Sequence, residues 1–133
     1  MELYKELNFN ELGDERGRLV IAEVPLNIPF DIKRIFYIYD TKGEIIRGQH
    51  ANLNSEFVLI NLCGKCKVKL DTGKEQKIVE LDRPHKGLYL NKMVWKDMYD
   101  FSDDSILLVL SSHVYDANEY IRDYDKFKEM VVK

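Results

Sequence analysis

The chain alternates between short apolar runs and short polar or turn-forming segments. Runs rich in β-branched, aromatic and leucine residues predict strands at 19–24, 34–39, 57–62, 65–70, 77–81, 87–90 and 105–110. The run 65–70 alternates strictly, with its three lysines on one face, and Asp71-Thr72-Gly73 after it predicts a turn. Many short strands with frequent turns favour an all-β barrel or jelly roll.

The C-terminal segment has a different pattern. Six apolar residues recur there at helical spacing: Tyr120, Ile121, Tyr124, Phe127, Met130 and Val131. Asp116 and Glu119 precede them with the spacing of a capping box. We therefore expect a short C-terminal helix that lays one face on the barrel, with its tyrosines as packing residues.

Composition and charge narrow the class of protein. The 133 residues contain only three prolines and no low-complexity segment, so we expect a single domain over residues 1–133. Basic residues are interspersed with acidic ones and the net charge is −3, which gives no reason to expect nucleic acid as a partner. No apolar run is long enough to cross a membrane, and the N-terminus lacks the apolar core of a signal peptide. We expect a soluble, cytoplasmic protein.

The two cysteines, Cys63 and Cys66, form a C-x-x-C motif. A redox-active pair belongs at a helix N-terminus, whereas this pair lies between two predicted strands, and a zinc site would need a second pair of ligands. We interpret the cysteines as two reduced thiols that flank a hairpin.

The segment Arg47-Gly48-Gln49-His50-Ala51-Asn52, followed by Glu56 and Gly64, resembles the first motif of a cupin barrel. Cupins usually hold a metal with two histidines, a carboxylate and a third histidine on a later strand. Here Asn52 replaces the second histidine, and the later histidine is missing. Because metal sites usually take three or four protein ligands, we expect no metal, and proton chemistry at His50 instead.

Further segments extend the resemblance over nearly the whole chain: 32–40, 47–51, 84–89, 94–98, 115–116 and 120–124. In this order they resemble the nucleotide-sugar 3,4-ketoisomerases of the WxcM-like cupin family. The resemblance implies an all-β cupin jelly roll that needs no metal and no cofactor. It also implies conversion of TDP-4-keto-6-deoxyglucose to its 3-keto isomer, for 3-amino-3,6-dideoxy sugars of surface glycans such as lipopolysaccharide or of antibiotics. Members are homodimers that exchange an N-terminal strand.

The chemistry needs a proton removed from C3 and a proton delivered to C4 through an enediol. Histidine suits this task because its pKa lies near working pH, so His50 is expected to act as base and then as acid. The resemblance places Tyr37 in the barrel interior, where its hydroxyl could stabilise the enediolate oxygen. Arg47 is expected to hold the site together or to meet the diphosphate.

Other residues are assigned to the substrate or to the support of His50. Arg16 matches a family position near the sugar, Lys96 keeps a positive charge in the site, and Trp95 could stack on the thymine or the sugar or be a core residue. Glu56 could fix the tautomer of His50 or lie on the barrel rim. Asn52 departs from the family pattern R-G-x-H-A-H. It can orient the substrate but cannot carry a proton near neutral pH.

Two other functions stay open at this point. Because Asn52 replaces a family histidine, one alternative is a cupin that binds a nucleotide sugar without turning it over. A metal-dependent oxygenase or epimerase is a weaker alternative. The C4 configuration of the product is also open. A single base that returns its proton to the same ring face would give the galacto product, whereas a gluco product needs a donor on the other face.

Overall fold

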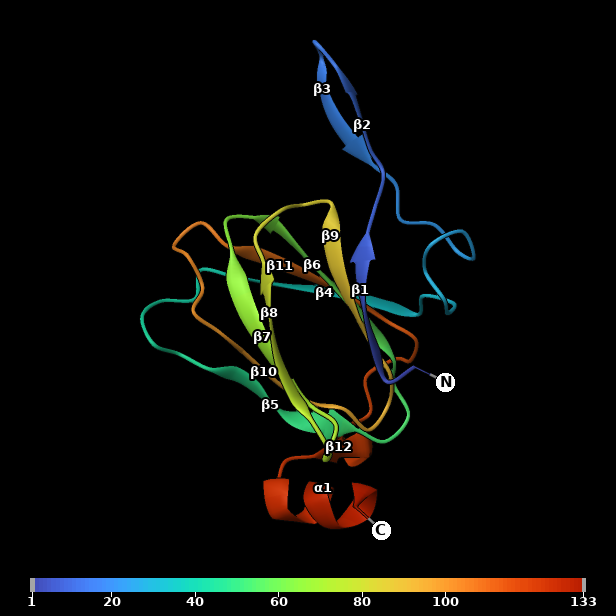
Figure 1. The fold of residues 1–133 in the computed structure, drawn as a ribbon, viewed down its shortest axis with the longest axis vertical. Helices are drawn as coiled ribbons and strands as arrows, with labels where there is room; N and C mark the ends of the chain where they lie inside the picture. Colours follow the sequence, from blue (N-terminus) through green and yellow to red (C-terminus); the bar gives the residue numbers. More distant parts are fainter. Residues whose placement is uncertain (1, 133) are drawn as a thin grey trace.

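Two five-stranded antiparallel sheets face each other in the computed structural model, which describes residues 2–132 (Figure 1). The first sheet has the order β1 (Tyr4–Asn8), β9 (Lys86–Leu90), β6 (Phe57–Cys63), β11 (Ile106–Ser111) and β4 (Arg34–Tyr39). The second has the order β12 (Tyr120–Ile121), β5 (Arg47–Asn52), β10 (Trp95–Tyr99), β7 (Cys66–Asp71) and β8 (Gln76–Leu81). The predicted all-β, cupin-like fold is confirmed.

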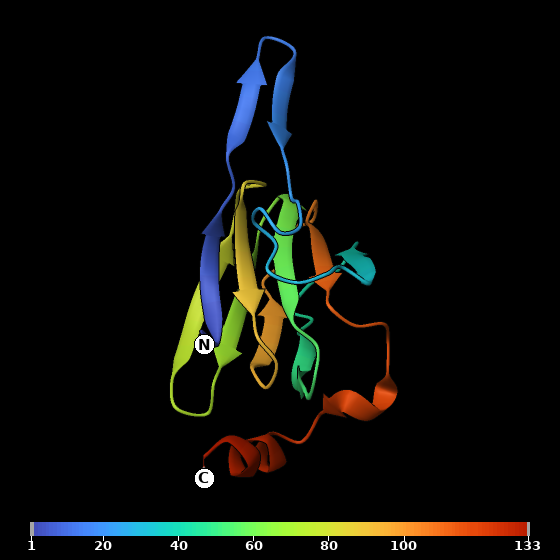
Figure 2. The same ribbon diagram turned by 90° about the vertical axis from the view of Figure 1, so that its right-hand side faces the viewer.

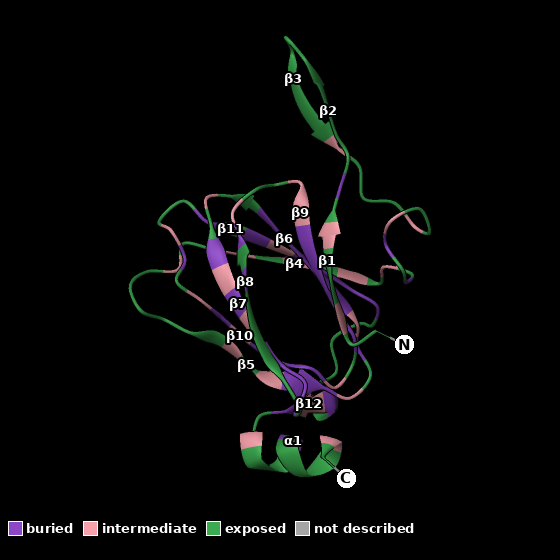
Figure 3. Cartoon of the chain, viewed as in Figure 1, coloured by how far each residue is buried: buried purple, intermediate pink, exposed green. Residues whose placement is uncertain are grey.

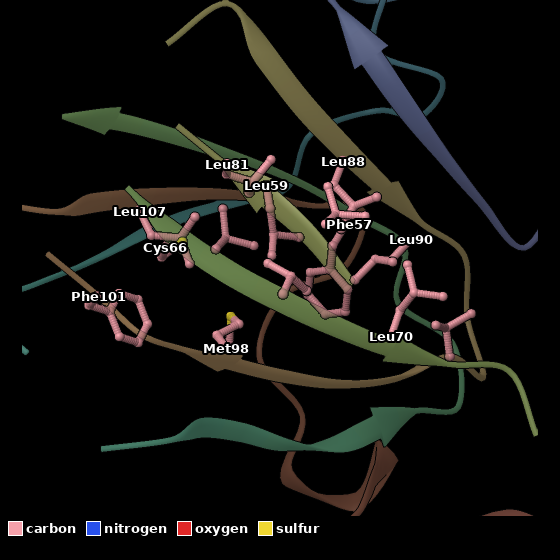
Figure 4. Packing of buried hydrophobic residues seen from close by; sticks show 14 residues of the cluster. Phe57, Leu59, Cys66, Leu70, Leu81, Leu88, Leu90, Met98, Phe101 and Leu107 are labelled. Carbon is pink, nitrogen blue, oxygen red and sulfur yellow. The ribbon is translucent and has the colours of Figure 1, made fainter. Parts of the chain in front are cut away.

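The main core lies between the two sheets. Alternate residues of each strand point inward, as Figure 4 shows for Leu59 of β6, Leu70 of β7 and Leu88 of β9. All three are at most 1% exposed. Burial is concentrated in the strands of the two sheets, while the surrounding loops are largely exposed (Figure 3). This packing leaves one part of the interior, toward β4 and β5, free to hold a pocket.

A hairpin of β2 (Glu11–Asp14) and β3 (Gly17–Val20) stands apart from both sheets. It projects well beyond the body of the molecule in two perpendicular views (Figures 1 and 2). The strand predicted at 19–24 is therefore wrong beyond Val20. The side chain of Asn27 explains the change, because it binds the carbonyl of Ile21 and the amide of Glu23 and folds this stretch into a loop.

The C-terminal segment is helical over a shorter stretch than predicted. Helix α1 (Tyr124–Val131) begins after Asp123, whose side chain accepts from the amide of Lys126. Asp116 instead caps a 3₁₀ helix, η1 (Ala117–Glu119). Tyr120 and Ile121 are not helical, because they pair with Asn52 and Ala51 of β5 as strand β12. The predicted capping box at Asp116 and Glu119 is wrong.

The C-x-x-C motif joins β6 to β7 by a tight turn. Both thiols are free, with Cys63 exposed and Cys66 buried. Burial raises the pKa of Cys66 to about 12. A thiol that keeps its proton at neutral pH is a poor nucleophile, so Cys66 has a packing role.

Candidate active site

A pocket of about 120 Å³ opens between the sheets and is lined by strands β4, β5, β6, β10, β11 and β12. Most of its wall is apolar: Phe36, Ile38, Phe57, Leu59, Met98 and Val109. The polar groups are few and lie on one side, on Arg47 and His50 of β5, Lys96 of β10 and Tyr120 of β12. A small set of polar groups in an apolar cavity is the usual composition of a ligand site.

His50 reaches the pocket because β5 is irregular just before it. Gly48 has φ +84°, and a Cβ atom there would lie 2.9 Å from the carbonyl oxygen of Lys96 on β10. The Gly48 carbonyl is 3.0 Å from Nδ1 of His50. Because a carbonyl only accepts, Nδ1 of the neutral ring carries the proton and Nε2 is left as the basic atom.

The surroundings of His50 keep its ring neutral. Burial and, after it, the nearby charge of Lys96 lower the pKa of His50 from 6.5 to about 4, against the opposing effect of the Gly48 carbonyl. The ring of Tyr120 packs on the imidazole, with their centroids 4.7 Å apart. His50 is therefore an unprotonated base at neutral pH, held by a backbone hydrogen bond on one side and an aromatic ring on the other.

Lys96 lies directly opposite His50 in the β5–β10 register. It is 4% exposed, and its Nζ donates to Oδ1 of Asn52 at 3.2 Å and lies 4.7 Å from the ring centroid of Phe57. Burial lowers the pKa of Lys96 from 10.5 to about 7. Asn52 is fully buried behind the pocket wall and contacts the site through Lys96.

Three arginines surround this site. Arg47 lines the pocket directly. The guanidinium of Arg122 lies 4.8 Å from the ring centroid of Tyr120. The guanidinium of Arg34 lies over Phe36 and Tyr115, and its Nε and Nη2 are buried without a hydrogen-bond partner among residues 2–132. Buried donors without a partner are rare, so Arg34 is suited to an anionic ligand.

The predicted placement of Tyr37 in the barrel interior is wrong, because its side chain lies on the other face of its strand, and of the two alternatives for Trp95 the structure favours the core residue. Phe36 and Ile38 are the residues of β4 that enter the pocket, so Tyr37 between them points outward, 62% exposed and stacked on Tyr39. Trp95 is a core residue under α1, with its ring centroid 5.3 Å from that of Tyr124. Neither residue belongs to the pocket of His50.

Glu56 and Arg16 also lie away from His50. Glu56 accepts a hydrogen bond of 2.5 Å from the hydroxyl of Tyr89 and faces an open hollow of about 720 Å³ beside β1. The Gly48 carbonyl, not Glu56, fixes the tautomer of His50. Arg16 is at the tip of the β2–β3 hairpin, in an ion pair with Asp14, and its side chain is 85% exposed.

The structure adds residues that the sequence patterns did not identify. Tyr120 was interpreted as a helical packing residue and Glu119 as a helix cap, yet Tyr120 lines the pocket and Glu119 is buried beside Asn54 and Ser55. The only signal for Tyr120 in the sequence was the resemblance over 120–124, and Glu119 lies outside that segment. The pairing of β12 with β5 brings this segment to the site.

The described residues contain neither a cluster of metal ligands nor a membrane-spanning helix. Among residues 2–132, no three side chains of His, Cys, Asp or Glu lie close enough together to hold a metal ion. Within the same residues, no helix is long and apolar enough to cross a bilayer.

Comparison with known proteins gives close similarities over the whole fold. Residues 3–132 match the family FdtA (WxcM-like, C-terminal). The TDP-4-oxo-6-deoxy-alpha-D-glucose-3,4-oxoisomerase of Aneurinibacillus thermoaerophilus is 49% identical, over 97% of this chain and 93% of that protein. Two solved structures are also similar. WlaRA, a TDP-fucose-3,4-ketoisomerase from Campylobacter jejuni, is 48% identical with a TM-score of 0.92, over 96% of this chain and 95% of that chain. QdtA, a sugar 3,4-ketoisomerase from Thermoanaerobacterium thermosaccharolyticum solved in complex with TDP, is 39% identical with a TM-score of 0.94, over 98% and 95%.

Proposed function

This chain belongs to the FdtA (WxcM-like, C-terminal) family and is a sugar 3,4-ketoisomerase, and we propose that His50 performs the isomerisation of TDP-4-keto-6-deoxyglucose in the pocket between the sheets. The observation that carries this proposal is the neutral imidazole of His50, whose Nδ1 is engaged by Gly48 and whose Nε2 is free to take a proton. A ketone beside C3 acidifies the C3 hydrogen, and a positioned neutral histidine is a suitable base for it.

The pocket suits a 6-deoxy hexose linked to a diphosphate. Its apolar wall, which includes Phe36, Ile38 and Met98, can pack against the C6 methyl group. Arg47, Arg34 and Arg122 can neutralise the two phosphates, because planar guanidinium groups match phosphate oxygens in pairs. The unsatisfied nitrogens of Arg34 support this assignment.

In the proposed reaction His50 Nε2 takes the proton from C3, and the electrons of that bond form the C3–C4 double bond of an enediolate whose negative charge lies on the C4 oxygen. A proton passes from the C3 hydroxyl to the C4 oxygen, and the imidazolium delivers a proton to C4 as the C3 oxygen becomes the new ketone. The ring starts and ends neutral, which agrees with a pKa well below working pH. The residue cycles between base and acid within each turnover.

A His50→Asn substitution tests this assignment, because asparagine keeps polarity at the site but cannot exchange a proton near neutral pH. We expect kcat to fall by about 100-fold or more, as is usual on removal of a general base, with little change in TDP affinity measured by calorimetry. His113→Asn is the matched control, because His113 is exposed and lies outside the pocket. Full activity of His50→Asn would show that another group is the base.

We infer in addition that the protein works as a homodimer that exchanges its N-terminal hairpin. An isolated two-stranded hairpin is marginal in water, and this one exposes Leu12 and Leu19. Strand β4 is an unpaired edge of its sheet, and its outer face exposes Ile35, Tyr37 and Tyr39. A hairpin seated on a second copy would bury both surfaces and would carry Arg16 toward the partner.

A further inference from the structure

Lys96 is a buried cation without a counter-ion. No carboxylate oxygen among residues 2–132 forms an ion pair with its Nζ, whose only hydrogen-bond acceptor is the neutral amide oxygen of Asn52. A buried lysine is costly unless it is paired, and the structure does not pair it. Its position opposite His50, on the same inward face of neighbouring strands, places both side chains beside a single bound sugar.

Glu119 supplies a negative charge behind the pocket wall. It directly precedes Tyr120, which lines the pocket, but does not line the pocket itself. It is 3% exposed, and its Oε1 accepts from the amides of Asn54 and Ser55 at 3.0 and 2.9 Å. Its Oε2 accepts from the hydroxyl of Ser55. These bonds hold the carboxylate beside Asn54 and Ser55, and its charge acts on the ammonium group of Lys96 through space.

Asn52 contacts both charged residues. It accepts from Lys96, and its side-chain amide also helps to lower the pKa of the Glu119 carboxyl. Its Nδ2 is buried and has no hydrogen bond of normal geometry within the described residues 2–132. The neutral amide of Asn52 accepts from Lys96 and thus orients it without forming an ion pair that would fix its proton.

We propose that Lys96 is the second proton-transfer group of the pocket, serving the two sugar oxygens while His50 serves the two carbons, and that Asn52 and Glu119 are its positioning residues. This proposal rests on the proposed function, because it assigns the other proton of the same reaction. It gives a role to a buried cation that a single catalytic histidine leaves unexplained.

The two groups balance the reaction. As His50 takes the C3 proton, the ammonium group of Lys96 donates a proton to the C4 oxygen, and a neutral enediol forms. The amine of Lys96 then takes the hydroxyl proton from the C3 oxygen, which becomes the ketone, while the imidazolium protonates C4. Lys96 ends as ammonium and His50 ends neutral, so the enzyme needs no other proton source.

The surroundings of Lys96 support such a role. The titratable and charged groups facing it are His50 and Arg47 of β5 and Glu119 of η1, while β7 and β6 offer Leu70 and Phe57. Burial lowers the pKa of the lysine to about 7, and the charge of Glu119 opposes that shift. A lysine that gains and loses a proton near neutral pH can transfer protons to and from the substrate, whereas an arginine keeps its proton.

Replacement of Lys96 distinguishes proton transfer from simple charge. In Lys96→Met we expect kcat with TDP-4-keto-6-deoxyglucose to fall by about 100-fold or more, with TDP affinity changed by less than about 3-fold. Lys96→Arg should stay equally slow, because arginine keeps the charge but does not release its proton. Lys92→Met, at an exposed lysine before β10, is the control. Activity in Lys96→Arg near that of the native enzyme would overturn the proposal.

The pH profile of kcat tests the positioning residues. Activity should fall at high pH as Lys96 loses its proton. Glu119→Gln removes a charge that favours the ammonium form, so the alkaline limb should move to lower pH. Asn52→Asp adds a carboxylate at the atom that accepts from Lys96, so the limb should move to higher pH. Glu129→Gln, on the exposed face of α1, should leave the limb in place.

The outcomes separate this inference from the function on which it rests. If native protein, Glu119→Gln and Asn52→Asp all share the same alkaline limb, Glu119 and Asn52 do not position Lys96, although the isomerase assignment stands. If Lys96→Met and Lys96→Arg are slow and the limb shifts as described, both stand. A native protein without turnover would instead remove the proposed function itself.

Discussion

At the scale of residues, the site combines a neutral base with a buried cation on neighbouring strands. Burial shifts the pKa of His50 and the pKa of Lys96 in the same direction, toward the uncharged form, because a charged group loses hydration inside the barrel. The result is a histidine that is fully deprotonated and a lysine that is only partly protonated at neutral pH. A histidine and a lysine on the surface would stay hydrated, so burial would not shift their pKa values in this way.

The lowered pKa of His50 also predicts how stability depends on pH. Between pH 6.5 and about 4 the unfolded chain binds a proton at this position that the folded chain does not. The free energy of unfolding should therefore fall as pH falls through this window. In His50→Gln that contribution is absent, so urea unfolding at a series of pH values should show a shallower decline than in the native protein. Equal slopes would contradict the lowered pKa.

The sequence motif predicted some of the residues that line the pocket but not every strand face correctly. Arg47, His50 and Lys96 do line the pocket. Tyr37 does not, because a strand turns alternate residues to opposite faces and Phe36 and Ile38 occupy the inward face of β4. Trp95 also lies outside the pocket, as the core residue that was one of its two predicted roles. Only the positions of the partner strands decide which face of a strand points inward, and those depend on contacts far apart in the sequence.

At the scale of elements, β5 depends on the absence of a side chain at Gly48. A Cβ atom there would lie 2.9 Å from the Lys96 carbonyl and 3.0 Å from the Met98 side chain, and φ is +84°. Gly48→Ala should destabilise the fold by about 1–3 kcal/mol and lower kcat, because it displaces the carbonyl that orients His50. Thermal unfolding and turnover measure the two effects.

Gly43→Ala is the matched comparison for Gly48→Ala. Gly43 also has a positive φ, +67°, but a Cβ atom there would meet nothing within 4 Å. It should show the backbone strain alone, about 1 kcal/mol, with kcat unchanged. If both substitutions affected kcat equally, the close approach of β5 to β10 would not matter for the site.

The C-terminal elements show where local sequence patterns fail. Helical spacing identified α1, and Phe127 of that helix is fully buried against Trp95. The same spacing wrongly extended the helix over Tyr120 and Ile121. Pairing with β5 overrides the local preference there, and it brings Tyr120 and Glu119 to the site. No local pattern could have indicated that a cap-like glutamate is a buried neighbour of Asn52.

At the scale of the whole molecule, the resemblance predicted the jelly roll that the two sheets form. The homodimer with an exchanged N-terminal strand stays a prediction, for which we propose the β2–β3 hairpin as the exchanged element. A Leu12→Ser, Leu19→Ser double variant should weaken the dimer, because both side chains are exposed in the single chain. Sedimentation equilibrium should show native dimers and variant monomers. Ile78→Ser, at another exposed apolar position on β8, should leave the dimer intact. A native monomer would contradict the exchange.

The central claim is that this pocket isomerises TDP-4-keto-6-deoxyglucose with His50 serving both carbons. The most direct test is proton NMR of the native protein with that sugar in deuterated water. We expect a 3-keto product with the galacto configuration at C4, because one base on one ring face delivers a proton to that same face. Deuterium at C4 measures how far the imidazolium proton exchanges with solvent before it is delivered. A gluco product would require a second carbon acid, and TDP binding without any 3-keto product would contradict the assignment of the function.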